Sequence, residues 1–359
     1  CKEFAEAFRL NRDDLILSNA YIYEPYFGCM ENLNCYVIFQ EKYGAGEPTD
    51  VMVDAILDDL RGKDFDRIVA VGGGTVIDIA KVLTVAKSTD RVDDLYDRMA
   101  SLEKEHELII VPTTCGTGSE VTNISIINRT TKGVKVGLVS PAMFADEAAL
   151  VPGMLLSLPY PVFATSSIDA MVHAVESYLS PNACALSELF SAKALHLILS
   201  CWKDAVAAGG KDAWKKHALE FLRASNYAGI AFGHAGCAAV HAMAYPLGGV
   251  HHIPHGQANQ LMFADVMRKY QEKKPIGKLN QLEELLGAEL DVEPVFSLEN
   301  LYKLMDEVLE KDPLHEHGVT ADELPVFAKN VIETQQRLLG NNYVELTEDD
   351  LLDIYRKAF

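Results

Sequence analysis

The sequence is short of positive charge. Its 359 residues include 32 lysines and arginines against 52 aspartates and glutamates, which gives a formal net charge of −20. Nucleic-acid binding depends on clustered lysine and arginine, and an anionic membrane surface attracts basic segments. We therefore expect a protein that binds neither nucleic acid nor membrane.

Long apolar runs and paired cysteines are also missing. The longest apolar stretch, residues 68–86, contains Asp78, Lys81 and three consecutive glycines, so it does not predict a membrane span. The seven cysteines are scattered and odd in number, without a Cys-x-x-Cys pair. This favours reduced thiols in a cytoplasmic protein over disulfides or a zinc ribbon. No signal peptide is evident, and because the first residue is Cys1 and not methionine, we expect the true N-terminus to be missing.

The distribution of apolar residues indicates two domains, as the length also suggests. Up to residue 158, short β-branched runs alternate with helical spacing; the runs are residues 15–17, 35–39, 67–71, 108–111 and 134–139. Such alternation predicts buried strands in a parallel sheet covered by helices on both faces. Beyond residue 158 only helical periodicity remains. We expect an α/β domain over residues 1–158 and an all-α domain over residues 159–359.

A glycine-rich turn follows the run at residues 67–71. Gly72, Gly73 and Gly74 lead into Thr75 and a helical pattern that contains Asp78. Glycines allow a phosphate to approach the backbone, and a helix N-terminus favours an anion. The pattern is neither a Walker A loop nor a Gly-x-Gly-x-x-Gly fingerprint, so a tight turn without a ligand remains an alternative.

A second polar loop follows the run at residues 108–111. It contains Thr113, Thr114, Thr117 and Ser119, which offer hydroxyl groups just beyond the carboxyl end of a strand. Open α/β sheets bind ligands at that edge. Two such loops in one sheet favour a bound dinucleotide over two structural turns.

Histidines are concentrated in one segment. Five of the eleven lie between residues 234 and 255, and upstream Asp169 and His173 are spaced one helical turn apart. Asp169, His173, His241 and His255 make a complete ligand set for Fe²⁺ or Zn²⁺. We expect His241 on a helix that ends before Pro246, with the following glycines returning the chain. A hydrogen-bonded Asp–His pair is the alternative, and the sequence leaves the choice among the histidines open.

Together, these motifs resemble those of the iron-containing (metal-dependent, group III) alcohol dehydrogenases. The matching segments are residues 72–81, 112–120, 169–173 and 241–256, in the order typical of the family. The resemblance covers essentially the whole chain and implies the dehydroquinate synthase-like architecture, an α/β dinucleotide-binding domain followed by an all-α domain. It implies NAD and a divalent metal as cofactors, Fe²⁺ before Zn²⁺, and a cytoplasmic homo-oligomer, a dimer or larger.

The resemblance also assigns roles by position. The metal ligands are Asp169, His173, His241 and His255. The cofactor-binding residues are Asn19, Gly72, Gly73, Gly74, Thr75, Asp78, Thr113, Thr114, Thr117, Ser119 and Lys135. Many NAD-linked members have aspartate where Asn19 stands. Since no arginine adjoins Asn19 to receive a 2′-phosphate, NAD is favoured over NADP.

The proton path departs from the family pattern. Tyr245 stands where many members have a second histidine, four residues after the third ligand. Tyr245, His251 and His252 are therefore the candidates to carry a proton. The alternative for each is a hydrogen bond to a metal ligand.

The substrate follows from a narrower resemblance. Residues 40–44, 225–233 and 335–343 are similar to family members that interconvert 4-hydroxybutanoate and succinate semialdehyde. Arg337 is the candidate to bind the substrate carboxylate, with a salt bridge between helices as its alternative. Other readings are a 1,3-propanediol, butanol or lactaldehyde specificity, a dehydroquinate synthase-like lyase, and a non-catalytic nucleotide-binding protein.

Overall fold

The computed structural model describes residues 2–30 and 33–359, which divide into two units. Unit 1 comprises Cys1–Thr114 and Ser119–Leu158, and unit 2 comprises Cys115–Gly118 and Pro159–Phe359. The short segment 115–118 therefore belongs to the second unit, although the chain on either side of it belongs to the first.

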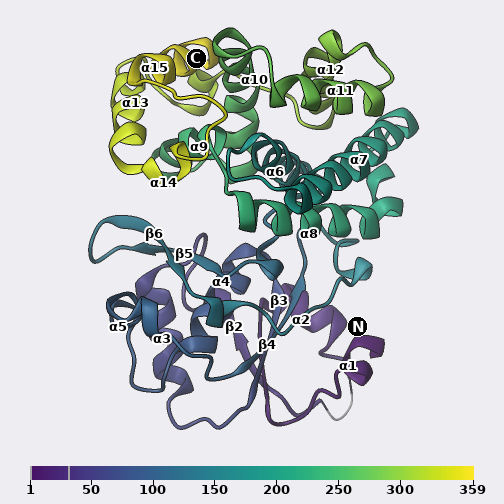
Figure 1. Ribbon diagram of the computed structural model, residues 1–359. Helices are drawn as coiled ribbons and strands as arrows, with labels where there is room; N and C mark the ends of the chain where they lie inside the picture. Colours follow the sequence, from purple (N-terminus) through teal and green to yellow (C-terminus); the bar gives the residue numbers. More distant parts are fainter. Residues whose placement is uncertain (1, 31–32) are drawn as a thin grey trace. The chain divides into compact units, whose positions relative to one another are not determined.

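Unit 1 contains a parallel five-stranded sheet in the order β2-β1-β3-β4-β7, which confirms the predicted fold class. Figure 1 labels three of these strands, β2, β3 and β4. The strands are β1 Asp14–Ser18, β2 Tyr36–Phe39, β3 Arg67–Gly72, β4 Glu107–Pro112 and β7 Glu147–Ala148. The helices are α1 Lys2–Ala7, α2 Ala20–Tyr26, α3 Asp50–Leu60, α4 Gly74–Val85 and α5 Val92–Asp97.

The central strands β1, β3 and β4 are buried on both faces of this sheet. Strand β2 lies at the edge and is only partly buried, so the expectation of a buried strand at residues 35–39 was wrong. Leu15, Ile68 and Leu108 point to one face and join a core that contains side chains of α3, α4 and α5. Their strand neighbours Ile16 and Val69 point to the other face and pack with side chains of α1 and α2. Because successive residues of a strand face opposite sides, continuous apolar runs suit these central strands.

The segment 134–139 does not belong to the parallel sheet. It forms β6 (Val134–Val139), which pairs antiparallel with β5 (Ile124–Arg129) as a separate hairpin. The expectation of a buried strand was wrong here, since Val134, Val136 and Val139 are 48%, 38% and 40% exposed. Valine favours a strand on exposed and buried surfaces alike, so its presence did not reveal burial.

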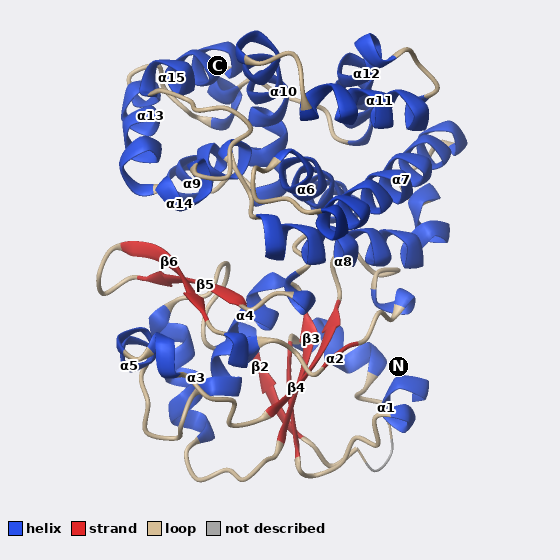
Figure 2. Cartoon of the chain, viewed as in Figure 1, coloured by secondary structure: helices blue, strands red, loops and turns tan. Residues whose placement is uncertain are grey.

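The described part of unit 2 contains helices and no strand (Figure 2). They are α6 Tyr160–Leu179, α7 Ala185–Ala208, α8 Ala218–Ala235, α9 Ala239–His251, α10 His255–Lys273, α11 Lys278–Leu290, α12 Ser297–Val308, α13 Glu323–Thr334, α14 Gln336–Leu339 and α15 Glu348–Ala358. Helix α6 is buried along most of its length against α7, α8 and α10. None of the described helices is long and apolar enough to span a bilayer.

Helix α9 continues through Pro246, so the expected end before that residue was wrong. Proline removes one helical hydrogen bond, and here the buried surroundings of the helix outweigh that loss. The chain turns instead at His252, which adopts a left-handed conformation with φ 56°. Pro254 then precedes α10, whose first residue is His255.

Candidate metal centre and cofactor loops

The four predicted metal ligands converge within unit 2. Helix α6 carries Asp169 and His173 one turn apart, α9 carries His241, and α10 begins with His255. The Oδ1 atom of Asp169 lies 3.4 Å from Nε2 of His241, 3.6 Å from Nε2 of His255 and 3.8 Å from Nδ1 of His173. Three helices thus bring one carboxylate and three imidazoles to a common point.

The hydrogen bonding at this point fits a cation. Nδ1 of His173 is buried and has no hydrogen-bond partner among the described residues. The amide nitrogen of Asn259 lies 2.8 Å from Oδ1 of Asp169, 3.2 Å from Nε2 of His241 and 3.4 Å from Nε2 of His255. These three acceptor atoms thus converge on one amide group, and the buried Nδ1 of His173 faces the same point. A divalent metal suits such a donor set.

The pKa values of His173 and His241 differ because of burial and the nearby carboxylates. Burial lowers the pKa of His173 to about 3, which outweighs the attraction of Asp169. Burial also opposes protonation of His241, but hydrogen bonds to Asp169 and Glu176 raise its pKa to about 9. The neighbouring histidines hold the pKa of Asp169 below its usual range despite burial. The two histidines thus differ in proton affinity because only His241 is bonded to two carboxylates.

Two residues beside the ligands were missed by the sequence analysis. Glu176 accepts a hydrogen bond from Nδ1 of His241, and Asn259 donates one to Asp169. Glu176 is seven residues after Asp169, and Asn259 is four after His255, so both spacings place them near the same helix face as a ligand. That spacing was the available signal.

The two predicted cofactor loops lie side by side in unit 1. Gly72 pairs with Pro112 at the carboxyl ends of β3 and β4, and the amide of Thr113 donates to the carbonyl of Gly72 at 3.0 Å. A Cβ atom on Gly73 would lie 3.3 Å from Cγ2 of Thr114. Gly73 is the N-cap of α4, whose first residue is Gly74, so open backbone amides face this edge of the sheet.

Asp78 and Ser119 belong to a buried polar network. Ser119 donates to Asp78 at 2.8 Å, and Lys81 donates to Ser119, Thr122 and the carbonyl of Ile124 at 2.8–2.9 Å. Burial lowers the pKa of Lys81 to about 8, although Asp78 opposes this change. The network holds the second loop against α4. Asp78 and Ser119 therefore support the position of this loop.

Asn19 occupies the first turn after β1 and is bonded to Glu41. Its amide nitrogen donates to Oε2 of Glu41 at 2.9 Å, while Oε1 accepts the backbone N–H of Ala20 at 2.7 Å. Glu41 follows β2, the strand next to β1, and is exposed. An acidic residue is thus present at this edge of the sheet, although Asn19 replaces the aspartate that the resemblance led us to look for.

The remaining predicted cofactor residues are dispersed. Thr75 donates to the carbonyl of Gly46 at 3.0 Å, and Lys135 on β6 forms an ion pair with Glu47 at 2.7 Å. Thr117 lies in the segment that belongs to unit 2.

The three proton-path candidates have different surroundings. The ring centroid of Tyr245 is 6.1 Å from that of His255. Nε2 of His251 lies 3.1 Å from a carboxylate oxygen of Glu323. His252 forms the exposed left-handed end of α9. The structure thus brings Tyr245 toward a ligand, whereas His251 is bonded elsewhere.

Arg337 lies on the short helix α14 and is exposed. The described residues provide no carboxylate within 4.0 Å of its guanidinium, so the salt bridge considered as its alternative is not found. Its positive charge acts on the buried thiol of Cys237, partly opposing the burial that raises the pKa of Cys237 well above its ordinary value. Cys237 is itself grouped with His173 and His241, with ligand atoms within 4.8 Å of one another. Among the described residues, Arg337 thus has no carboxylate partner, and its charge acts on Cys237.

Comparison with known proteins identifies the family. Residues 9–152 match the model of the iron-containing alcohol dehydrogenases, and residues 163–359 match the model of the C-terminal part of the Fe-containing alcohol dehydrogenase family. The chain belongs to the iron-containing alcohol dehydrogenase family and is an alcohol oxidoreductase.

Two curated relatives span most of this chain. The chain is 45% identical to the 4-hydroxybutyrate dehydrogenase of Clostridium kluyveri over 360 residues, which covers all of this chain and 96% of that protein. It is 35% identical to long-chain-alcohol dehydrogenase 1 of Geobacillus thermodenitrificans, over 89% of this chain and 83% of the relative.

The fold is also found among solved structures. The structure of sulfoacetaldehyde reductase from Bifidobacterium kashiwanohense in complex with NAD⁺ aligns with a TM-score of 0.85 at 23% identity, over 99% of this chain and 93% of that chain. A 1,3-propanediol oxidoreductase structure aligns with a TM-score of 0.84 at 25% identity, over 99% of this chain and 94% of that chain.

Proposed function

We propose that this enzyme interconverts 4-hydroxybutanoate and succinate semialdehyde: 4-hydroxybutanoate + NAD⁺ ⇌ succinate semialdehyde + NADH + H⁺. The observation that carries the proposal is the 45% identity, over the whole chain, to a protein named for the first of these compounds. The converging donor atoms on α6, α9 and α10 support the metal dependence of the reaction.

Asp169, His173, His241 and His255 are the proposed ligands of a divalent metal, Fe²⁺ before Zn²⁺. When bound there, such a metal supplies Lewis acidity that lowers the pKa of an alcohol. One carboxylate among three neutral imidazoles leaves a net positive charge at the centre, which favours a developing oxyanion. We assign proton transfer toward solvent to Tyr245, because its ring lies near His255 while His251 is bonded to Glu323.

NAD is the proposed cofactor, bound by the glycine turn and by the loop that contains Thr113 and Thr114. Backbone amides at the start of α4 suit a pyrophosphate. The carboxylate of Glu41 beside Asn19 suits a ribose hydroxyl and repels a 2′-phosphate, which favours NAD over NADP.

Arg337 is the proposed partner of the substrate carboxylate. A guanidinium binds a carboxylate through two parallel hydrogen bonds, and the described residues leave this one without a carboxylate. Replacement by alanine (Arg337→Ala) should lower kcat/KM for 4-hydroxybutanoate about 10- to 100-fold, the loss expected for a charged hydrogen-bonded pair. The value for 1-butanol should hardly change. Equal losses for both substrates would exclude carboxylate binding, and Arg337→Lys tests whether the planar fork is needed.

The direct assay follows NADH oxidation with succinate semialdehyde after anaerobic reconstitution with Fe²⁺ or Zn²⁺. We expect a higher kcat/KM for succinate semialdehyde than for butanal, lactaldehyde or 3-hydroxypropanal. A preference for one of those aldehydes would overturn the assigned substrate. No net change in NADH with any alcohol or aldehyde would overturn the reaction class. That is the result expected of a lyase, which takes a hydride from its substrate and returns it.

We also propose that the enzyme works in the cytoplasm as a homo-oligomer of two or more chains. None of the six described cysteines forms a disulfide, and three of them are buried, which suits a reducing compartment. Light scattering on the purified enzyme measures the assembly, and a monomer would contradict it.

A further inference from the structure

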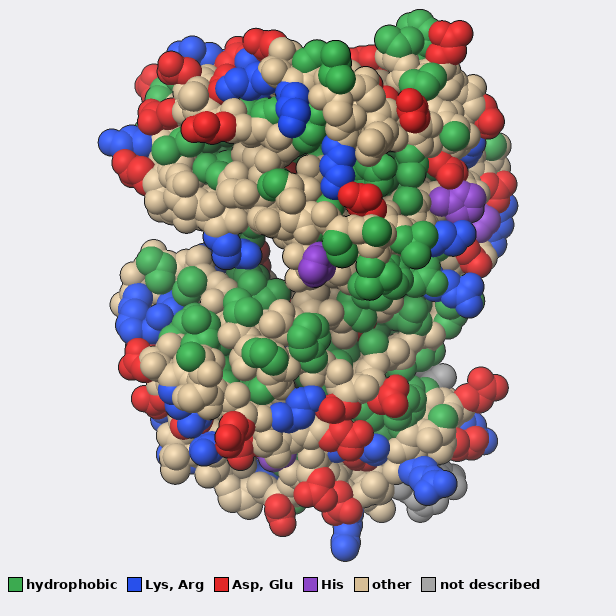
Figure 3. Space-filling view, viewed as in Figure 1, with side chains coloured by type: hydrophobic (Ala, Val, Ile, Leu, Met, Phe, Trp, Pro, Cys, Tyr) green, Lys and Arg blue, Asp and Glu red, His purple; other side chains and the backbone are tan. Residues whose placement is uncertain are grey.

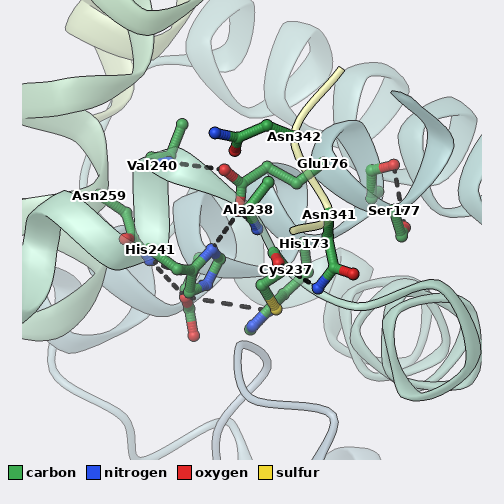
Figure 4. A network of polar contacts seen from close by, with 12 residues as sticks. His173, Glu176, Ser177, Cys237, Ala238, Val240, His241, Asn259, Asn341 and Asn342 are labelled. Atoms are coloured by element: carbon green, nitrogen blue, oxygen red, sulfur yellow. Dashed lines mark hydrogen bonds and ion pairs between the residues drawn. The ribbon is translucent and has the colours of Figure 1, made fainter. Parts of the chain in front are cut away.

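Glu176 is a fully buried carboxylate behind one of the proposed metal ligands. It lies on α6 and accepts hydrogen bonds from Nδ1 of His241 at 2.6 Å, from the amide of Val240 at 2.6 Å and from the amide of Ala238 at 2.9 Å (Figure 4). All three donors belong to the start of α9 or the residue before it. One carboxylate of α6 thus binds both the side chain and the backbone of the segment that carries His241.

This carboxylate has no lysine or arginine to balance it. Among the residues that the structure describes, its one ion-pair partner is His241. Burying a carboxylate is costly unless hydrogen bonds compensate for the loss of water. The three donors compensate for the burial of this carboxylate, and one of them is His241, whose other ring nitrogen faces Asp169. This arrangement indicates that the charge of Glu176 acts on His241.

We propose that Glu176 is a positioning residue for the metal centre. A carboxylate only accepts hydrogen bonds, so Glu176 keeps a proton on Nδ1 of His241 and directs Nε2, 3.4 Å from Asp169, toward the metal. Its two bonds to backbone amides hold the start of α9 against α6, the helix that carries Asp169 and His173. The inference rests on the proposed metal dependence and concerns the geometry and affinity of the centre, whatever the alcohol substrate.

Glu176→Gln is the informative substitution. Glutamine preserves the volume but supplies one acceptor oxygen and one N–H₂ group, while the wild-type carboxylate accepts on both oxygens. At least one of the three donors then faces another donor. We expect the dissociation constants for Zn²⁺ and Co²⁺ to rise about 10- to 100-fold. The visible d–d spectrum of the Co²⁺ enzyme should also change, because His241 no longer holds one orientation.

Ser177→Ala provides a matched control on the same helix. Ser177 is also fully buried, and its hydroxyl bonds Ser191 at 2.8 Å and the carbonyl of Ala174 at 3.2 Å (Figure 4). Losing these bonds should lower the Tm of the variant. Neither bond involves a proposed metal ligand, so the metal centre should keep its geometry. We expect wild-type metal affinity and a wild-type Co²⁺ spectrum for this variant.

The outcomes separate the roles. Wild-type affinity and spectrum in Glu176→Gln would overturn the inference, and so would equal changes in Ser177→Ala. If Glu176→Gln does not fold, ¹⁵N chemical shifts of the histidines in the zinc-loaded wild-type enzyme decide. The inference then requires a zinc-bound histidine with its proton on Nδ1, and the absence of one would contradict it. Failure of the wild type to bind metal would instead overturn the proposed function.

Discussion

At the residue scale, Glu41 is the residue to which we assign the proposed choice of NAD over NADP. Its carboxylate is fixed by the backbone amide of Ala20 and by the side chain of Asn19, at the end of the strand beside β1. These bonds hold the pKa of Glu41 below its usual range despite partial burial, so the group is charged at neutral pH. A charged oxygen there favours a ribose hydroxyl over a phosphate.

Replacing Glu41 by glutamine should therefore weaken NAD⁺ and strengthen NADP⁺. We expect the Kd for NAD⁺ to rise about fivefold, as for the loss of a hydrogen bond, and the Kd for NADP⁺ to fall. Quenching of protein fluorescence measures both constants. Glu24→Gln, an exposed change on α2, is the control and should leave the ratio unchanged. An unchanged ratio in Glu41→Gln as well would exclude this role.

Residues of rare type were easier to predict than carboxylates. The four proposed metal ligands were predicted from the density of histidines and the spacing of Asp169 and His173, and the structure brings their side chains together. Glu176 was not predicted, because its spacing from Asp169 did not single it out and its partner His241 lies 65 residues further along the chain. A glutamate in a helix is usually solvated, and the sequence alone does not show which one is buried.

At the element scale, the contact between α6 and α10 determines how two ligands meet. Gly256 follows His255 and lies against Thr165, one turn before Asp169. A Cβ atom at Gly256 would lie 1.9 Å from the carbonyl oxygen of Thr165, a distance that no packing tolerates. The missing side chain therefore allows the two helices to approach.

Gly256→Ala should push α10 away from α6 and separate His255 from Asp169. We expect the free energy of unfolding to fall by about 1–3 kcal/mol or more, as for overpacking, and metal affinity to fall with it. Gly249→Ala is the control, because Gly249 in α9 has no atom within 4 Å of an added Cβ. That change should be neutral or stabilising by about 0.5–1 kcal/mol. Similar metal affinities in both variants would contradict the role of Gly256.

Asp50 connects α3 to the turn of the β5–β6 hairpin. Its carboxylate accepts the hydroxyls of Thr130 and Thr131 at 2.7 Å and their backbone amides at 3.0 and 3.3 Å. Burial raises the pKa of Asp50, but these four bonds outweigh it and hold the pKa well below its usual range. The unfolded chain therefore binds this proton more readily than the folded protein does.

The stabilisation by Asp50 should thus be complete at neutral pH and disappear in acid. Asp50→Asn is expected to lose about 1–3 kcal/mol at pH 7, the value for hydrogen bonds to a charged group. The difference from wild type should shrink as the pH falls below about 4, the ordinary pKa of aspartate. Urea unfolding at several pH values measures it, with the exposed Asp97→Asn as control. A difference that does not depend on pH would contradict the account.

The same scale shows where elements could be predicted. Strands β1, β2, β3 and β4 of the parallel sheet were predicted from their apolar runs, and such runs suit strands buried on both faces, as Ile68 and Val69 are. Strand β7 was not predicted, because its two residues are exposed and form no apolar run. The end of α9 was missed because Pro246 usually stops a helix, whereas the buried packing of this one maintains it. Such packing involves segments far apart in the chain, so it cannot be predicted from the residues around Pro246.

At the scale of the whole molecule, the formal net charge is −20, and only a few acidic side chains of the described residues are buried. On the face shown in Figure 3, acidic side chains are spread over the surface among lysines and arginines. The proposed site has the opposite character locally, since it combines a cation centre with Arg337. The proposed chemistry thus depends on a few local groups and not on the net charge of the chain.

The central claim is that Asp169, His173, His241 and His255 hold the catalytic metal. Anomalous X-ray scattering at the iron or zinc absorption edge, from crystals of the metal-loaded enzyme, tests it most directly. The account predicts one strong peak at about 2.0–2.2 Å from a ligand atom of each of these four side chains. A peak at another group, or none from an enzyme that is active with added metal, would contradict it.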